Sequence, residues 1–153
     1  MSDIEAERQI RYWLLDMDGV LIHEEDPIPG APEFINRLKE LEIPFLVLTN
    51  SSIYSRRDLS ARLHRSGLDV PEKSIWTSAL ATATFLQDQR PNGSAFVVGE
   101  PGLATAMHEA GYTINESDPD HVVPGETRTY SLERIPQAIR LPLTGARFTA
   151  PTP

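Results

Sequence analysis

Two aspartates and a glycine follow the first apolar segment of the chain, in residues 14–20 (LLDMDGV). Two carboxylates this close together repel each other unless a cation or unequal protonation relieves the charge. A hard cation that prefers oxygen ligands, such as Mg²⁺, fits such a pair. Asp16 and Asp18 are therefore candidate metal ligands.

A second polar group, Thr49 and Asn50, follows the next apolar segment, in residues 45–51 (FLVLTNS). The carboxyl ends of neighbouring parallel strands share one edge of a sheet, which is where open α/β sheets bind ligands. Thr49 and Asn50 can then face Asp16 and hold an anion between them. We expect Asp16, Asp18, Thr49 and Asn50 to surround one anion-sized, magnesium-compatible cleft.

A purely structural interpretation of the first motif is a tight hairpin. Asp-Gly between apolar segments is a strong type I′ turn signal. This interpretation explains Gly19 but gives no reason for Asp16.

Strand-like and helix-like segments alternate along the chain, which is typical of an α/β fold with a parallel sheet. The pattern predicts strands at 12–15, 43–48, 75–76, 95–98, 112–114, 121–123 and 146–149. Helices are predicted at 31–42, from a capping box at Ser55 and Asp58 to a stop at Gly67, and at 79–89, 103–110 and 131–141.

Two helices carry more detailed expectations. Ile35, Leu38 and Leu41 should form the buried face of the first one. Pro136 lies inside the last one, where a proline costs about 3 kcal/mol, so either this helix begins or kinks there or the segment is not well formed. The strand at 12–15 is expected to be buried.

Composition narrows the possible partners. A net charge of −8 and a pI near 4.9 disfavour binding to nucleic acid. The one basic cluster, Arg56, Arg57, Arg62 and Arg65, is interpreted as a solvated helix surface.

The four histidines lack metal-ligand spacing and are expected at the surface or at helix caps. No apolar segment is long enough to cross a membrane and the N-terminus is charged, so a cytoplasmic location is expected.

The two motifs resemble motifs I and II of phosphatases of the haloacid dehalogenase (HAD) superfamily. The resemblance to the class IIA, NagD-like branch continues through residues 97–100 (VVGE), 120–123 (DHVV), 125–128 (GETR) and 145–148 (GARF). It implies an HAD-like Rossmannoid parallel sheet in residues 1–78, as a partial core, followed by part of an α/β C2-type cap in residues 79–153.

The resemblance also implies a chemistry. Asp16 would be the nucleophile that forms an aspartyl-phosphate, and Asp18 the acid/base that protonates the leaving oxygen and then activates water. Mg²⁺ would be held by the Asp16 carboxylate and the Asp18 backbone carbonyl, and Thr49 and Asn50 would donate hydrogen bonds to the phosphate. Residues 20–29 would form a hairpin flap. The substrate would be a small phosphorylated metabolite, such as a nucleoside monophosphate or a sugar phosphate, and a homo-oligomer is possible.

The chain departs from this family in two respects. Its only lysines, Lys39 and Lys73, precede the expected cap, and no Gly-Asp motif with a following aspartate occurs after Asp120. We therefore expect the chain to end inside the cap, to leave one sheet face and edge uncovered, and to show little turnover alone. The alternative is a non-catalytic α/β module for binding or assembly.

Overall fold

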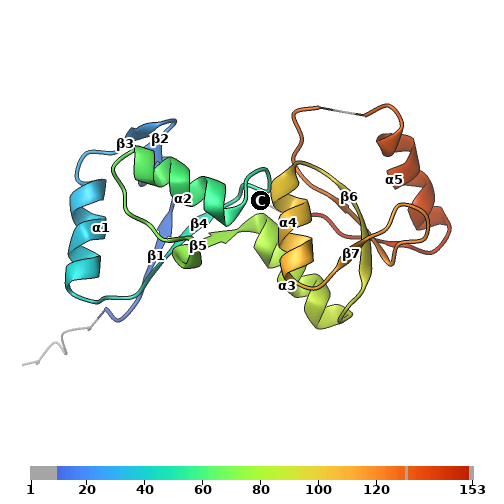
Figure 1. The fold of residues 1–153 in the computed structure, drawn as a ribbon, viewed down its shortest axis with the longest axis horizontal. Helices are drawn as coiled ribbons and strands as arrows, with labels where there is room; N and C mark the ends of the chain where they lie inside the picture. The colour runs from blue at the N-terminus through green and yellow to red at the C-terminus, as the bar shows by residue number, and fades with distance from the viewer. Residues whose placement is uncertain (1–9, 130, 152–153) are drawn as a thin grey trace, which may run out of the picture.

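The computed structural model describes residues 10–129 and 131–151, which form two lobes side by side (Figure 1). The N-lobe contains a three-stranded parallel sheet of order β1-β4-β5, with β1 at Trp13–Asp16, β4 at Phe45–Thr49 and β5 at Ile75–Thr77. The α-helices α1 (Ala31–Glu40) and α2 (Arg56–Arg65) and the 3₁₀ turn η1 (Glu72–Ser74) connect the strands. The predicted α/β class is confirmed.

Local sequence signals explain where both helices start. Gly30 has a φ of 89°, which favours glycine, and Pro32 lies in the first turn of α1. Before α2, the Asp58 amide donates to Ser55 Oγ at 3.2 Å and the Ser55 amide donates to Asp58 Oδ2 at 3.2 Å, so the predicted capping box is confirmed. Leu41 was expected on the buried face of α1, but it follows the last helical residue and is exposed.

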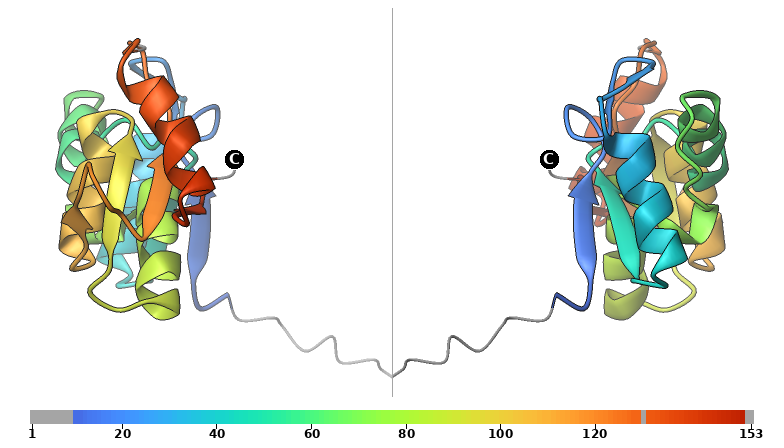
Figure 2. Two further views of the ribbon diagram at one scale, coloured as in Figure 1. Left: turned by 90° about the vertical axis from the view of Figure 1, so that its right-hand side faces the viewer. Right: turned by 90° about the vertical axis from the view of Figure 1, so that its left-hand side faces the viewer.

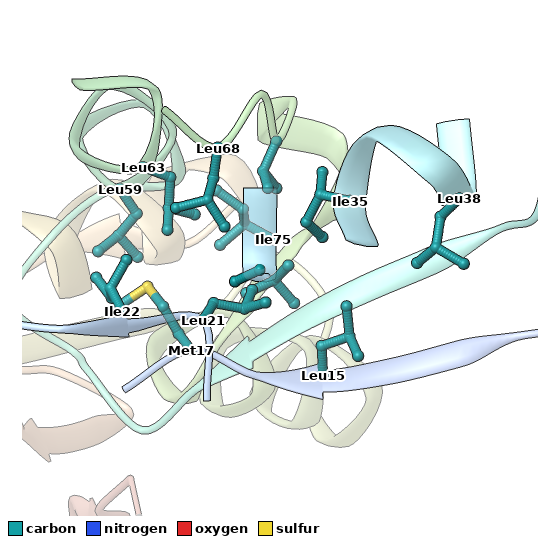
Figure 3. Packing of buried hydrophobic residues seen from close by; sticks show 13 residues of the cluster. Leu15, Met17, Leu21, Ile22, Ile35, Leu38, Leu59, Leu63, Leu68 and Ile75 are labelled. Atoms are coloured by element: carbon teal, nitrogen blue, oxygen red, sulfur yellow. The ribbon is translucent and has the colours of Figure 1, made fainter. Parts of the chain in front are cut away.

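The buried side chains of the N-lobe lie between the sheet and the helices (Figure 3). They include Leu15, Met17, Ile35, Leu38, Val47, Leu59, Leu63, Leu68 and Ile75. Tyr12 and Leu14 are 71% and 68% exposed, so the expectation of a buried strand is wrong for these residues. Successive side chains of a strand face opposite sides of the sheet, and only the side of Leu15 is covered by helices. The face of this sheet that carries Tyr12 and Leu14 is exposed, in agreement with the expectation that one sheet face is uncovered.

The C-lobe starts at α3 (Ser78–Gln89), directly after β5. Its sheet has the order β7-β6-β8-β9 and is parallel throughout. These strands are β6 (Ser94–Val98), β7 (Thr113–Ile114), β8 (His121–Pro124) and β9 (Arg147–Phe148), and the other helices are α4 (Pro101–Glu109) and α5 (Arg134–Leu143). Figure 2 shows α5 apart from α3 and α4, across the sheet. Accordingly, one buried cluster packs beneath α3 and α4 and another beneath α5.

The boundaries of α5 resolve the question that Pro136 posed. The helix begins at Arg134, so Pro136 lies in its first turn, where the backbone N–H has no partner within the helix. The first of the three predicted outcomes, a helix that begins near the proline, is therefore confirmed. None of the helices among residues 10–129 and 131–151 is long and apolar enough to cross a bilayer.

His121 contradicts the expectation of a surface histidine, because it is only 3% exposed within β8. His23, His64 and His108 are exposed as expected. Burial lowers the pKa of His121 below the ordinary value of 6.5, and Arg147 lowers it further, while Asp120 opposes this shift.

Acid should therefore destabilise the C-lobe through His121. The unfolded chain binds this proton more tightly than the folded chain does, so the stabilisation is complete above pH 6.5 and is lost as the pH falls below that value. Urea unfolding measured at about pH 7.5 and about pH 5.5 should show a smaller pH effect for His121→Gln than for the wild type. His108→Gln is the matched control, and an equal pH effect in all three proteins would contradict this assignment.

Candidate active site

Asp16 is the last residue of β1, and the register places it opposite Leu48 of β4. The strand pairing continues for one more residue, because the Met17 amide donates to Leu48 O at 3.0 Å. The same amide lies 2.9 Å from Asp16 Oδ1. Asp16 is exposed while Met17 is buried, so the strand presents the carboxylate to solvent at its carboxyl end.

Asp18 and Thr49 bring the two sequence motifs together. Thr49 is the last residue of β4 rather than part of the following turn, and its hydroxyl lies 3.4 Å from Asp18 Oδ2, a long hydrogen bond. The Ser51 amide donates to the same hydroxyl at 3.2 Å. A carboxylate of one motif and a hydroxyl of the other therefore meet at one edge of the sheet.

The turn after Asp18 leads into a flap, as expected. Gly19 has a φ of 84° and donates to Ile22 O at 2.8 Å. The flap is an antiparallel pair of two short strands, β2 (Ile22–His23) and β3 (Asp26–Pro27). The hairpin turns at Glu24 and Glu25, and β1 pairs with β4, so the interpretation of Asp18-Gly19 itself as a hairpin turn is wrong.

The structure does not bring all four predicted residues into contact. Asp16 and Thr49 occupy alternate pleat positions, since Asp16 pairs with Leu48, and in residues 10–129 and 131–151 no hydrogen bond joins them. Asn50 is exposed, and its carbonyl accepts a bond from Ser78 Oγ at 2.6 Å. Asn50 lines a cleft of about 420 Å³ between the lobes, which neither aspartate lines. A single cleft surrounded by all four residues therefore stays a prediction.

The residues that the structure describes supply only part of a metal site. Within them, no three His, Cys, Asp or Glu side chains cluster closely enough to hold an ion. The predicted ligands, the Asp16 carboxylate and the Asp18 backbone carbonyl, supply few of the six oxygens that Mg²⁺ prefers in octahedral geometry, and water and substrate would supply the rest. The pair fits one corner of a magnesium site and does not complete it.

Arg62 is a site residue that the sequence analysis missed. It was assigned to a solvated helix surface, but its side chain is only 20% exposed and its Nη1 lies 3.9 Å from Asp18 Oδ1. It also reaches the flap, because Nε donates to Glu25 Oε1 at 3.2 Å and Nη2 donates to Glu24 O. Helical spacing alone could not reveal these partners, which lie 37 and 38 residues away in sequence.

Arg62→Ala should loosen the flap. Ser66 Oγ still donates to Glu25 O at 2.7 Å in this variant, so we expect a partial loss, worth about 1 kcal/mol. The amide of Ile28, which donates to Leu21 O, should exchange with solvent about fivefold faster. Arg65→Ala, an exposed change on the same helix, is the control. Equal exchange rates in both variants would show that Arg62 does not hold the flap.

Comparison with known proteins defines the class. A family model described as haloacid dehalogenase-like hydrolase matches residues 13–113, which is more than half of the chain. The chain therefore belongs to the haloacid dehalogenase-like hydrolases, and the family expected from the two motifs is confirmed.

Two relatives and one solved structure show which members of this family the chain resembles. The chain is 56% identical over 141 residues to the dihydroxyacetone phosphatase of Corynebacterium glutamicum (strain R), covering 92% of this chain and 51% of that protein. It is 40% identical over 144 residues to the ribonucleotide monophosphatase NagD of Escherichia coli (strain K12), covering 94% and 57%. The solved structure of NagD from the E. coli K-12 strain superposes with a TM-score of 0.86 at 39% identity, over 94% of this chain and 57% of that one. The chain thus spans about half the length of the curated relatives it matches.

Proposed function

We propose that this chain supplies the nucleophile and the acid/base of a phosphomonoester hydrolase. Residues 1–78 would contribute the first part of the HAD core, and residues 79–153 part of the cap. The contact between Asp18 and Thr49 is the observation that supports this most strongly, because it joins the two motifs at one sheet edge in a chain of this family. Asp16 lies two residues before Asp18, at the end of β1, which pairs with the strand β4 that carries Thr49.

The proposed reaction proceeds in two displacements. An Asp16 carboxylate oxygen attacks phosphorus, the bond from phosphorus to the ester oxygen breaks, and Asp18 gives its proton to the leaving oxygen. Asp18 then takes a proton from water, the water oxygen attacks the aspartyl-phosphate, and phosphate leaves with Asp16 restored. Thr49 and Asn50 donate hydrogen bonds to the phosphoryl oxygens during both displacements.

Magnesium belongs to this proposal as a cofactor that the chain binds only in part. When bound, it would screen the charge between the carboxylates and the anionic phosphate. Asp16 and Asp18 are the residues of this chain that would hold it. We also propose that the protein acts in the cytoplasm without a nucleic acid or membrane partner. The net charge of −8 supports the absence of a nucleic acid partner, because it disfavours binding to a polyanion.

The proposed substrates are small phosphorylated metabolites. The relatives include proteins named dihydroxyacetone phosphatase, ribonucleotide monophosphatase and acid sugar phosphatase. The highest of the identities given above, 56%, belongs to the dihydroxyacetone phosphatase. Asn50 lines a cleft of about 420 Å³, a volume within the usual range of small-molecule sites. A three-carbon or sugar phosphate is therefore the first choice.

A chimera tests this function directly. The matched segment of the C. glutamicum enzyme is replaced by this chain, and the product is assayed with Mg²⁺ on a panel of phosphorylated metabolites. Magnesium-dependent release of phosphate from dihydroxyacetone phosphate or sugar phosphates is the expected result. A soluble, folded chimera that hydrolyses none of the panel would contradict the proposed function.

The 153 residues alone should show little or no turnover. Phosphate brought to Asp16 and Asp18 gathers like charges, and few ligands hold the cation that must balance them. Calorimetric titration should give weak magnesium binding, and p-nitrophenyl phosphate should be hydrolysed at close to the rate without protein. Robust magnesium-dependent turnover by this chain would show that fewer groups suffice for the chemistry.

A further inference from the structure

The loop that follows β4, residues 50–55, is bonded to the C-lobe at three successive residues. The Ser52 amide donates to Glu126 Oε2 at 3.1 Å, and the Glu126 amide donates back to Ser52 Oγ at 2.9 Å. The Gly102 amide donates to Ile53 O at 3.0 Å. Arg128 Nη2 donates to Tyr54 Oη at 2.8 Å.

Close packing surrounds the reciprocal pair of Ser52 and Glu126. Ser52 is buried, and a Cβ at Gly125 would lie 3.1 Å from its Oγ. Glu126 directly follows Gly125, which donates to Val98 O at 2.7 Å from the end of β8. The reciprocal pair therefore lies where the loop packs closely against the end of β8.

The loop connects this pair to the candidate site. The Ile53 amide donates to Ser51 Oγ at 3.3 Å, and the Ser51 amide donates to Thr49 Oγ1, which in turn lies 3.4 Å from Asp18 Oδ2. Ser52, which Glu126 binds, therefore lies in the backbone between Ser51 and Ile53, and the hydrogen bonds of these two neighbours lead to the hydroxyl of Thr49 and the carboxylate of Asp18.

We propose that Glu126, acting through Ser52, is a positioning residue that holds the loop of Thr49 and Asn50 in the conformation that binds phosphate. This proposal rests on the proposed function and adds to it, because a C-lobe residue then sets the affinity for the phosphate group itself. Since the donor is a backbone amide, a neutral carboxamide acceptor at this position should preserve the effect.

The test uses the 153-residue chain with Glu126→Ala, with Glu126→Gln and with a control, Glu133→Ala, which alters an exposed carboxylate of the same lobe. Amide exchange is measured at residues 51–54, and orthophosphate with Mg²⁺ is titrated while the amide NMR signals of Thr49 and Asn50 are followed. Glu126→Ala should speed exchange of the Ser52 amide about tenfold and weaken phosphate binding severalfold. Glu126→Gln should retain most of the slow exchange of the Ser52 amide and most of the affinity for phosphate. Glu133→Ala should match the wild type in both measurements.

The outcomes separate the two proposals. Unchanged exchange in Glu126→Ala would overturn the role of Glu126 in holding the loop. Faster exchange with unchanged phosphate binding would reduce Glu126 to a structural contact and overturn its positioning role. If orthophosphate moves neither signal in the wild-type chain, the phosphate role of Glu126 is overturned. The chimera assay tests the proposed function separately, and the exchange data alone decide whether Glu126 holds the loop.

Discussion

Asp16→Asn should abolish phosphatase activity in the chimera with the C. glutamicum enzyme. The carboxamide keeps the size of the side chain but removes the anionic oxygen that would attack phosphorus. Loss of a nucleophile that works together with an acid/base partner typically costs several orders of magnitude, and we expect kcat to fall by about 10⁴-fold or more. Asp16 is exposed at the end of β1, so the substitution should leave the stability of the fold nearly unchanged.

Two comparisons make this result specific. Asp18→Asn removes an acid/base rather than a nucleophile and should lower kcat by about 10²- to 10⁴-fold. Asp88→Asn makes the same chemical change at an exposed position of α3 and should leave kcat as it is. Turnover that survives Asp16→Asn undiminished would refute the nucleophile assignment.

Gly102→Ala should clearly destabilise the fold. A Cβ at this position would lie 2.5 Å from the carbonyl carbon of Tyr54 and 2.6 Å from Ile53 O, so backbone has to move. Overpacking of this kind costs about 1–3 kcal/mol, and in a chain of this size each kcal/mol lowers Tm by roughly 2–4 °C. The strain falls on α4 and on the loop after β4, so the contact between the lobes should weaken as well.

Gly99→Ala is the matched control for this prediction. Gly99 lies in the turn just before α4, three residues before Gly102, but its Cβ would meet no atom closer than 3.4 Å. Thermal unfolding should therefore show a clearly lower Tm for Gly102→Ala and nearly the wild-type value for Gly99→Ala. If the two variants unfold at the same temperature, the close approach of α4 to Tyr54 is not a constraint on the fold.

Local patterns predicted the elements of the fold well, because their causes are local. The capping box of Ser55 and Asp58 and the helix that begins near Pro136 depend on residues a few positions apart. Burial was harder to predict. Apolar residues at 12–15 suggested a strand covered on both faces, yet Leu14 is exposed, because a strand pattern does not say what covers each face.

The parts of the site that depend on distant partners could not be predicted from the sequence. The two motifs were found because each lies at the end of a strand, and parallel pairing then brings Asp18 to Thr49. Arg62 and Glu126 carry no such signal. Arg62 contacts Asp18 and Glu25 of the flap, and Glu126 contacts Ser52. Ser52 and Glu126 are 74 residues apart in sequence, and only the folded chain brings them together.

Trapping of a phosphoryl group on Asp16 tests the proposed function most directly. The chimera is mixed with a phosphomonoester and Mg²⁺, quenched with acid during the first turnover, digested and mapped by mass spectrometry. A phosphorylated peptide that contains Asp16 and is absent from the Asp16→Asn variant is the predicted result. Rapid turnover with no phosphorylated peptide, or with the phosphoryl group on another residue, would contradict the assignment of Asp16 as the nucleophile.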